Sequence, residues 1–307
     1  MTEKTSEVII IGGGPAGLTA GLYTSRAGLK SLLLEKGVFG GQITTAEHVE
    51  NFPGFPKGIS GIELGDLMLE QAEKYNLKTK STEAIGIQIQ GDKKIIRTPE
   101  DTYVTRALIV AGGSVRKKLG VPGENLFLGK GVSYCATCDS AFFRDMPVVV
   151  VGGGDAALTE ALHLAKHASS VTVIHRRRDL RATRILQERA FAEQKIHFVW
   201  NSTVAAIEGD STVKRVRLSN VETHNISELE TAGIFISVGF EPATELMQGL
   251  LSLDKIGHII TNDKMETSVP GIFAAGDIRH NSARQAITAA GDGATAAVNA
   301  QDYLEEE

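Results

Sequence analysis

The sequence contains the same strand–turn–helix unit twice, 140 residues apart. Residues Val8–Lys36 align without a gap with residues Val148–Arg176, and each copy opens with an apolar run followed by three consecutive glycines. Such a run is typical of a buried parallel strand, and the glycines are typical of a tight turn into a helix. Two copies in a chain of 307 residues predict two domains that each contain this unit.

The first copy carries the G-x-G-x-x-G pattern of a dinucleotide-binding turn at Gly12–Gly17. Glycines allow the backbone to turn tightly and to approach a pyrophosphate at the N-terminus of a helix. The next strand ends in Glu35, which is placed to accept hydrogen bonds from a ribose diol. The residues expected to contact this nucleotide are Gly12, Gly14, Pro15, Ala16, Gly17, Glu35 and Lys36.

The second copy differs from the first at the position that reads the ribose. His175 stands where the first copy has Glu35, and Arg176–Arg178 follow directly. A carboxylate would repel a 2′-phosphate, whereas guanidinium groups bind phosphate through charge-assisted hydrogen bonds. The first site therefore suits FAD or NAD and the second suits NADP, with His175 either contacting the phosphate or simply ending the strand. The residues expected at the second nucleotide are Gly152, Gly154, Asp155, Ala156, Ala157, His175, Arg176, Arg177 and Arg181.

The two cysteines of the chain, Cys135 and Cys138, form a C-x-x-C pair shortly before the second glycine turn. A structural zinc site needs four ligands, and the sequence has no second cysteine pair to complete one. Two inert buried thiols are a further alternative. A redox dithiol is the favoured interpretation, because sulfurs at this spacing can form and break a disulfide with little backbone movement. We therefore expect redox chemistry and no metal.

Charge and composition exclude several other classes of protein. The net charge is −5, and no block of Lys and Arg is dense enough to indicate a nucleic-acid surface. The sequence has no apolar run of 18 residues and begins with polar residues, so neither a membrane span nor a signal peptide is expected. With cysteines confined to one redox pair, the expected location is the cytoplasm.

The C-terminal part of the chain returns to the pattern of the first domain. An apolar run that ends in Gly276-Asp277 precedes a helix expected from about Arg284 to Asn299. The predicted fold is therefore α/β, with two Rossmann-like domains of three layers (ββα), the second inserted into the first. The expected boundaries are residues 1–115 and 247–307 for the first domain and 116–246 for the second.

Taken together, the motifs resemble the low-molecular-weight, prokaryotic-type thioredoxin reductases, which are FAD- and NADPH-dependent pyridine nucleotide-disulfide oxidoreductases. The resemblance covers nearly the whole chain. Besides the two nucleotide turns, it rests on Gly40–Gln42, Glu50-Asn51, Pro53-Gly54, Cys135–Asp139, Gly271–Asp277 and Arg284–Ala286. The chain departs from the pattern at Ser140, where many relatives have Gly, and at Gly112, where Ala-Thr-Gly is usual.

The resemblance implies FAD in the first domain, NADPH in the second, and a homodimer that reduces thioredoxin or a thioredoxin-like protein. It places further residues of the first domain at the FAD, namely Gly41, Gln42, Asn51, Gly276, Asp277, Arg284, Gln285 and Ala286. From the residues alone, the loops Phe39–Thr45 and Val49–Gly54 could equally be ordinary turns.

The resemblance also implies unequal roles for the redox residues. Cys138 would face the flavin, Cys135 would attack the partner disulfide, and Asp139 would handle protons as the dithiol forms. From the residues alone, Asp139 could instead cap the N-terminus of a helix.

The redox pair has to meet both the flavin and a protein partner. The family solves this by rotating one domain, and the two chain crossings near residues 113–118 and 239–246 would be the hinges. An alternative function is a flavoprotein of the same fold with other electron partners, such as a dithiol oxidase or a ferredoxin-linked reductase. The intact second turn and its arginines argue against that alternative.

Overall fold

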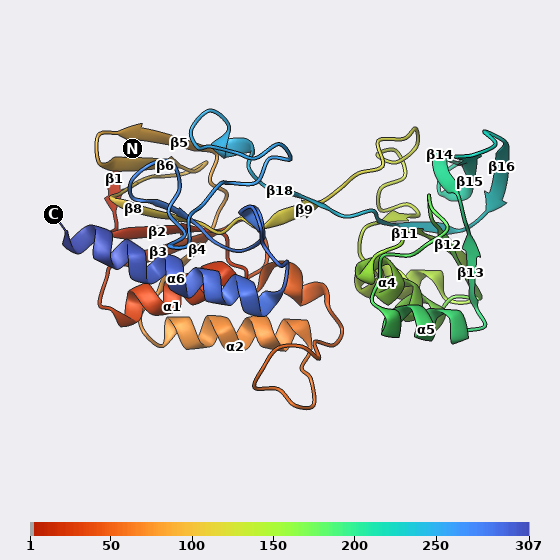
Figure 1. Cartoon of the computed structure of the whole chain (residues 1–307), viewed down its shortest axis with the longest axis horizontal. Coiled ribbons are helices and arrows are strands. Elements are labelled where there is room, and N and C mark those ends of the chain that lie inside the picture. The colour runs from red at the N-terminus through yellow and green to blue at the C-terminus, as the bar shows by residue number, and fades with distance from the viewer. Residues whose placement is uncertain (1–2, 307) are drawn as a thin grey trace. The chain divides into compact units, whose positions relative to one another are not determined.

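The computed structural model describes residues 3–306, and the chain forms two compact units. Unit 1 contains the residues up to Val115 together with those from Glu241 onward, and unit 2 contains Arg116–Phe240. The chain passes between the units at β9 (Ser114–Arg116) and β18 (Phe240–Pro242), which form a two-stranded sheet (Figure 1). The first and last parts of the sequence therefore fold together, and the middle part folds separately.

Unit 1 is built on a parallel sheet of five strands in the order β19-β8-β2-β3-β4. These strands are β2 (Val8–Ile11), β3 (Ser31–Glu35), β4 (Lys78–Ser81), β8 (Ala107–Val110) and β19 (Ile272–Ala274). Helices cover one face and a second sheet covers the other (Figure 1). The helices are α1 (Pro15–Arg26), α2 (Gly61–Glu73) and α6 (Ala286–Glu305). The second sheet contains β1 (Glu3–Thr5), β7 (Thr102–Thr105), β6 (Lys93–Arg97) and β5 (Gly86–Gln90), in that order.

The residues of β2 explain why this sheet needs a layer on each face. Val8 and Ile10 lie in the core between the sheet and the helices, together with Leu18 of α1. Ile9 lies in a separate core on the opposite face, together with Leu108. Since successive side chains of a strand point to opposite faces, an unbroken apolar run must be covered on both sides.

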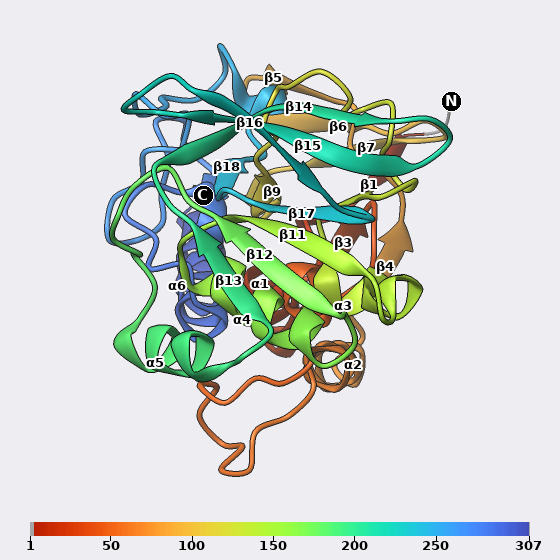
Figure 2. The ribbon, with the colours of Figure 1, turned by 90° about the vertical axis from the view of Figure 1, so that its right-hand side faces the viewer.

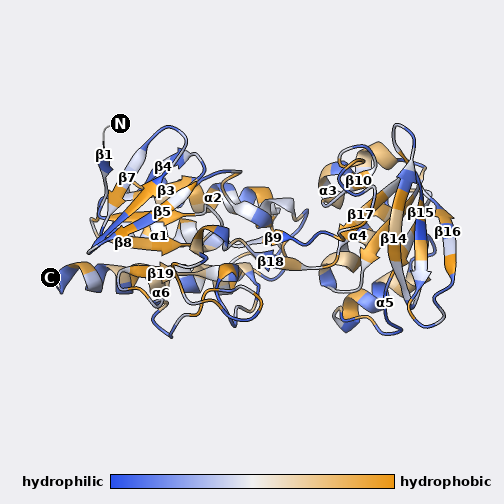
Figure 3. Cartoon of the chain, turned by 90° about the horizontal axis from the view of Figure 1, so that it is seen from above, coloured by the Kyte–Doolittle hydropathy of each residue, from blue (hydrophilic) through white to orange (hydrophobic). Residues whose placement is uncertain are grey.

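Unit 2 repeats the same three layers. Its parallel sheet has the order β10-β17-β11-β12-β13 and contains β10 (Val132–Ser133), β11 (Pro147–Gly152), β12 (Ser170–Ile174), β13 (Ile196–Val199) and β17 (Gly233–Ser237). Its helices are α3 (Ala136–Asp139), α4 (Asp155–Ala165) and α5 (Arg184–Ala192). An antiparallel sheet of β14 (Ser202–Gly209), β15 (Val213–Asn220) and β16 (Ile226–Glu230) lies opposite α4 and α5 (Figure 2). In both units the apolar residues are concentrated on the strands of the sheets (Figure 3).

Four short 3₁₀ segments complete the described elements. They are η1 (Gly41–Thr45), η3 (Glu245–Met247) and η4 (Gly276–Ile278) in unit 1 and η2 (Ser140–Phe143) in unit 2. In the described part of the chain, no helix is apolar over a length that would cross a bilayer.

The predicted fold class is confirmed, since β2–α1–β3 recurs as β11–α4–β12 in two Rossmann-type units. The predicted bounds of the last helix are wrong. It begins at Ala286 because Arg284 has a φ of 56° and Gln285 is extended. It continues to Glu305 because Tyr303 and Leu304 pack against the core.

Helices α1 and α6 are in tight contact at Gly293. A Cβ atom at Gly293 would lie 2.1 Å from the carbonyl oxygen of Ala16, a contact that no real structure tolerates. A Cβ atom at Gly291, on the same helix, would have no atom within 4 Å. Gly293 is therefore required by packing, whereas Gly291 is not.

We expect Gly293→Ala to lower the free energy of unfolding by roughly 1–3 kcal/mol, because the added methyl forces the two helices apart. Gly291→Ala is the matched control and should raise that free energy by up to about 1 kcal/mol, because alanine is the better helix former. Urea unfolding followed by circular dichroism measures both changes. Equal effects of the two substitutions would contradict the packing argument.

Candidate active site

The two cysteines are joined in a disulfide at the start of the short helix α3. Their Cα atoms are 5.4 Å apart, and the Cys138 N–H donates to the Cys135 sulfur at 3.2 Å, so that Cys135 is the N-cap residue of α3. Cys138 is exposed and Cys135 is partly buried. The structure thus contains the disulfide that the spacing predicts, and it can open and close without a change of fold.

The redox pair lies at the carboxyl edge of the parallel sheet of unit 2. Strand β10 ends at Ser133, which is in register with Phe235 of β17, and Phe235 is in register with Val150 of β11. Strand β11 continues for two more residues into the second glycine turn at Gly152. Disulfide and glycine turn therefore share the edge at which open α/β sheets bind their ligands.

Asp139 lies at the end of α3, and its carboxylate is not a helix cap. No side-chain cap is formed by Asp139, and its Oδ2 atom instead accepts a hydrogen bond from the Ser133 hydroxyl at 2.6 Å. The Cys135 N–H in turn donates to the Ser133 oxygen at 3.0 Å. The capping alternative is therefore wrong, because the Asp139 carboxylate forms no side-chain cap hydrogen bond and is instead held by Ser133.

Tyr134, the residue before Cys135, is held in place by a hydrogen bond to Glu124. Burial disfavours ionisation of Glu124, but hydrogen bonds from Tyr134 and from the backbone of Leu119 and Gly120 outweigh it and lower the pKa of Glu124. Burial and this carboxylate raise the pKa of Tyr134 above its ordinary value. Tyr134 therefore remains a neutral donor, and its bond to Glu124 ties the chain ahead of Cys135 to the loop around Gly120.

A cavity of about 300 Å³ opens beside the second glycine turn. Of the residues predicted for the second nucleotide, Gly152, His175, Arg176 and Arg181 line it. Its other lining residues are Lys117, Lys118, Leu119, Val121, Val151, Gly153, Ile174, Ser202, Thr203, Val204, Ser237 and Val238. The two lysines escaped the sequence interpretation because they lie far from the turn along the chain, in the segment that enters unit 2.

The remaining arginines and Asp155 have other surroundings. Arg177 is exposed and does not line the cavity, and Arg178 forms an ion pair with Glu222 at 3.4 Å. The Asp155 carboxylate accepts a hydrogen bond from the Thr183 N–H at 2.6 Å. Asp155 thus ties the turn to the start of α5.

His175 lies buried against the glycine turn. A Cβ atom at Gly153 would lie 2.4 Å from the imidazole ring, and Nε2 is 3.1 Å from the carbonyl oxygen of Asp179. Burial lowers the pKa of His175, and the charges of Arg181 and Arg176 lower it further. The imidazole is therefore neutral at pH 7 and adds no positive charge toward a phosphate, which favours its role in ending the strand.

The first glycine turn has the close contacts that its pattern predicts. A Cβ atom at Gly17 would lie 1.8 Å from the carbonyl oxygen of Gly12, whereas a Cβ atom at Gly14 would lie 4.0 Å from its nearest neighbour, the carbonyl oxygen of Gly40. Glu35 accepts hydrogen bonds from the N–H groups of Gly13 and Gly37, both at 2.5 Å. The carboxylate at the end of β3 is thus held beside the N-terminus of α1, where no side chain caps the helix.

Comparison with known proteins identifies the family. The model of the pyridine nucleotide-disulphide oxidoreductases matches residues 6–293. The chain belongs to this family. Thioredoxin reductase of Bacillus subtilis is 48% identical over 305 residues, which are 99% of this chain and 96% of that protein.

Two solved structures are also similar. The crystal structure of thioredoxin reductase from Lactococcus lactis has 46% identity and a TM-score of 0.95, over 98% of this chain and all of that one. A ferredoxin-flavin thioredoxin reductase from Clostridium acetobutylicum has 30% identity and a TM-score of 0.56 over the whole of both chains. The predicted resemblance to the thioredoxin reductases is thereby confirmed.

The loops of unit 1 that thioredoxin reductases are expected to place along the flavin meet in this structure. The Asn51 amide donates to the Gln285 side-chain oxygen at 2.9 Å, although the two residues are 234 positions apart. Gln285 is the N-cap residue of α6, and Ala286 begins that helix. The Gln42 amide donates to the carbonyl oxygen of Ser114. The first contact connects the loop around Asn51 with the start of α6, and the second connects η1 with β9.

Asp277 follows β19 in the turn that thioredoxin reductases are expected to use for FAD. Burial raises the pKa of Asp277, and the hydrogen bond from Ser282 at 3.0 Å and the nearby Arg284 only partly offset this effect. A partly buried carboxyl group can accept hydrogen bonds from hydroxyl groups such as those of FAD. Gly276 has a φ of 79°, which brings its backbone close to Ala16 of α1.

The Asp277 turn is held by a residue that the sequence interpretation missed. Asp292 of α6 is buried and accepts hydrogen bonds from the Gly276 N–H at 3.1 Å and from two nitrogens of Arg279, each at 2.7 Å. The sequence did contain a signal for this role, because Asp292 is an acidic residue among the alanines and glycines of α6. Bidentate pairs of this kind fix geometry as well as charge.

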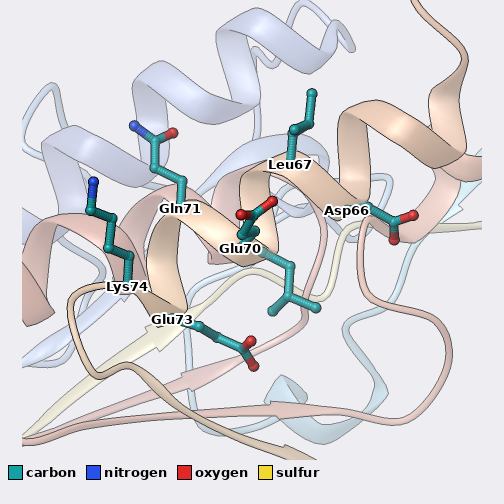
Figure 4. A pocket seen from close by; sticks show the side chains of 7 residues that line it. Asp66, Leu67, Glu70, Gln71, Glu73 and Lys74 are labelled. Atoms are coloured by element: carbon teal, nitrogen blue, oxygen red, sulfur yellow. The ribbon is translucent and has the colours of Figure 1, made fainter.

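A shallow depression of about 880 Å³ lies along α2 and contains none of the predicted site residues (Figure 4). It is lined by Asp66, Leu67, Leu69, Glu70, Gln71, Glu73 and Lys74. Within residues 3–306, no group of three or more His, Cys, Asp or Glu side chains could hold a metal ion.

Asp277→Asn should separate stability from FAD binding. In the flavin-free protein the pKa of Asp277 is raised by folding, so as pH rises this carboxyl group loses its proton in the unfolded state before it does so in the folded state. The free energy of unfolding of the wild type therefore falls as pH rises above the ordinary pKa range of aspartate. Asparagine removes that loss, so the variant should be the more stable apoprotein at pH 7 and should bind FAD more weakly. Urea unfolding between pH 4 and 7, with the exposed Asp263→Asn as control, tests this. An apoprotein destabilised at pH 7 would contradict it.

Proposed function

We propose that this protein is an NADPH-dependent thioredoxin reductase that binds FAD. The observation that carries the proposal is the Cys135–Cys138 disulfide at the sheet edge that also bears the second glycine turn. Membership of the family and relatives that match along nearly the whole chain support it. We assign FAD to unit 1 and NADPH to unit 2. FAD, when bound, would supply the two-electron transfer between NADPH and the disulfide.

The side chains of unit 2 then carry out thiol–disulfide exchange. The Cys135 thiolate attacks a sulfur of the partner disulfide, which forms a mixed disulfide and releases one partner thiolate. The Cys138 thiolate attacks Cys135 Sγ, which restores the Cys135–Cys138 bond and releases the second partner thiolate. Two electrons and two protons pass to the partner, and Asp139 takes one proton from the dithiol and returns it to a leaving thiolate.

We also propose that unit 2 rotates between the two half-reactions. The redox disulfide has to exchange electrons with the flavin and then with a protein. Strands β9 and β18 are the two chain crossings about which such a rotation would occur. A covalent cross-link between the units should block turnover while FAD stays bound, and unchanged turnover would contradict the rotation.

The purified protein should be yellow, NADPH should bleach the flavin, and oxidised thioredoxin should then gain two thiols. Cys135→Ser and Cys138→Ser should each reduce thioredoxin turnover to background, because either change removes the disulfide. Cys138 is the more exposed residue of the pair here, and the two variants also test the assignment of Cys135 as the attacking thiol. The flavin spectra of the two variants should differ. Turnover by either variant would contradict the function, and identical spectra would contradict the unequal roles.

The choice of NADPH over NADH should depend on the arginines that line the cavity of unit 2. Replacing Arg176 and Arg181 by alanine should raise the Kd for NADPH by roughly 10–100-fold, the effect of losing charge-assisted hydrogen bonds, and leave the Kd for NADH unchanged. The control is Arg178→Ala, since Arg178 pairs with Glu222. Equilibrium titrations give the constants, and equal weakening for both nucleotides would contradict the 2′-phosphate assignment.

The alternative, a dithiol oxidase or a ferredoxin-linked reductase, predicts that NADPH leaves the flavin oxidised. Arg176 and Arg181 line the cavity beside the second turn, which speaks against an unused nucleotide site. The flavin-bleaching experiment separates the two functions.

We propose in addition that the protein is a cytoplasmic homodimer. The confinement of both cysteines to one redox pair supports a reducing compartment. Exposed apolar residues on α2, Ile62 and Leu67, support a second copy as a binding partner. Sedimentation equilibrium of the FAD-bound protein tests the dimer.

A further inference from the structure

The Ser133 hydroxyl connects the proposed proton-handling acid to the backbone of the redox pair. Ser133 is the last residue of β10, and only 4% of it is exposed. Its oxygen lies 2.6 Å from Asp139 Oδ2, 3.0 Å from the Cys135 nitrogen and 3.3 Å from the Cys135 carbonyl oxygen. One buried hydroxyl therefore contacts three groups of a segment that contains both cysteines.

A hydroxyl has one proton to donate and two positions at which it accepts. The Cys135 N–H occupies one accepting position of Ser133. The hydroxyl proton has two acceptors within reach, the Asp139 carboxylate and the more distant carbonyl oxygen of Cys135. An ionised carboxylate attracts the proton more strongly, so it is the partner when Asp139 is charged.

When Asp139 carries a proton, the same three atoms can remain paired. The carboxyl group then donates to the second accepting position of Ser133, and the hydroxyl proton turns to the Cys135 carbonyl oxygen. No buried polar atom loses its partner in either state, so a change of protonation does not incur the cost of an unsatisfied group. Alanine at position 133 would leave the Cys135 N–H and the carboxyl group without this shared partner.

We propose that Ser133 is a positioning residue for thiol–disulfide exchange. It holds the Asp139 carboxyl group beside the redox pair in both protonation states and acts on the reaction through Asp139. During exchange, two electrons pass from the dithiol to the partner disulfide, and Asp139 transfers one of the two protons. This inference rests on the proposed function, because it assigns a residue to the same reaction.

Two measurements separate this role from simple folding. The first is the rate at which NADPH bleaches the flavin, and the second is the rate at which the reduced FAD-bound protein forms thiols on oxidised thioredoxin. Ser133→Ala should slow thiol formation on thioredoxin by roughly tenfold or more, as expected for a lost hydrogen bond to a charged group. The same variant should leave the rate of flavin bleaching by NADPH unchanged. Ser133→Thr, which keeps the hydroxyl, should exchange faster than Ser133→Val, which has the same shape without it.

Ser140→Ala is the matched control. Ser140 is also 4% exposed and directly follows Asp139, but its hydroxyl lies 3.0 Å from His163 Nε2. This variant should keep the wild-type exchange rate. A loss equal to that of Ser133→Ala would overturn the proposal, because it would show a general effect of removing a buried hydroxyl.

A double-mutant cycle with Asp139→Asn tests whether Ser133 acts through the acid. Ser133→Ala should cause little further loss once Asp139 is asparagine, and a full additional loss would overturn the proposal. If Ser133→Ala does not fold, the rates of thiol formation on thioredoxin by Ser133→Thr and Ser133→Val decide. Equal rates for these two variants would overturn the proposal. A wild-type protein that transfers no electrons from NADPH to thioredoxin would instead contradict the proposed function itself.

Discussion

The close approach of a helix to the strand before it is the constraint on which both units depend. At the first turn, Gly17 leaves no room for a Cβ atom against the carbonyl oxygen of Gly12. At the second turn, a Cβ atom at Gly152 would lie 2.3 Å from the carbonyl oxygen of Ser237 and 2.7 Å from the Ala157 methyl. Only a backbone without side chains can turn this sharply, and the turn leaves the N-terminus of the helix open at the sheet edge.

The redox pair depends on the same edge. Strand β10 adds to the sheet of unit 2 in parallel, so its carboxyl end points in the same direction as the end of β11. The segment after β10 contains the disulfide, and the segment after β11 contains the glycine turn. Parallel pairing thus places the thiol chemistry and the nucleotide turn on one side of the unit, where Ala136 of α3 lies in the same apolar core as Ala157 of α4.

Much of this could be predicted because its signals are local. Apolar runs, consecutive glycines and the acid or arginines at a strand end all fall within about 30 residues of one another. His175 shows the limit of such signals. Its position after the strand predicted a phosphate contact and a strand end equally well, and burial against Gly153 is what keeps it neutral.

The sequence by itself determined the two Rossmann-type units and the cysteine pair that forms the disulfide, and it predicted different ribose preferences for the two nucleotide sites. These follow from residue type and short spacing, which act before the chain has folded. Only the tertiary structure decided which side chains meet: Asn51 with Gln285, Asp292 with Arg279, and Ser133 with Asp139. The first of these contacts joins residues 234 positions apart, and the last joins the end of β10 to the end of α3. Such contacts arise from how elements pack, so no local pattern in the sequence encodes them.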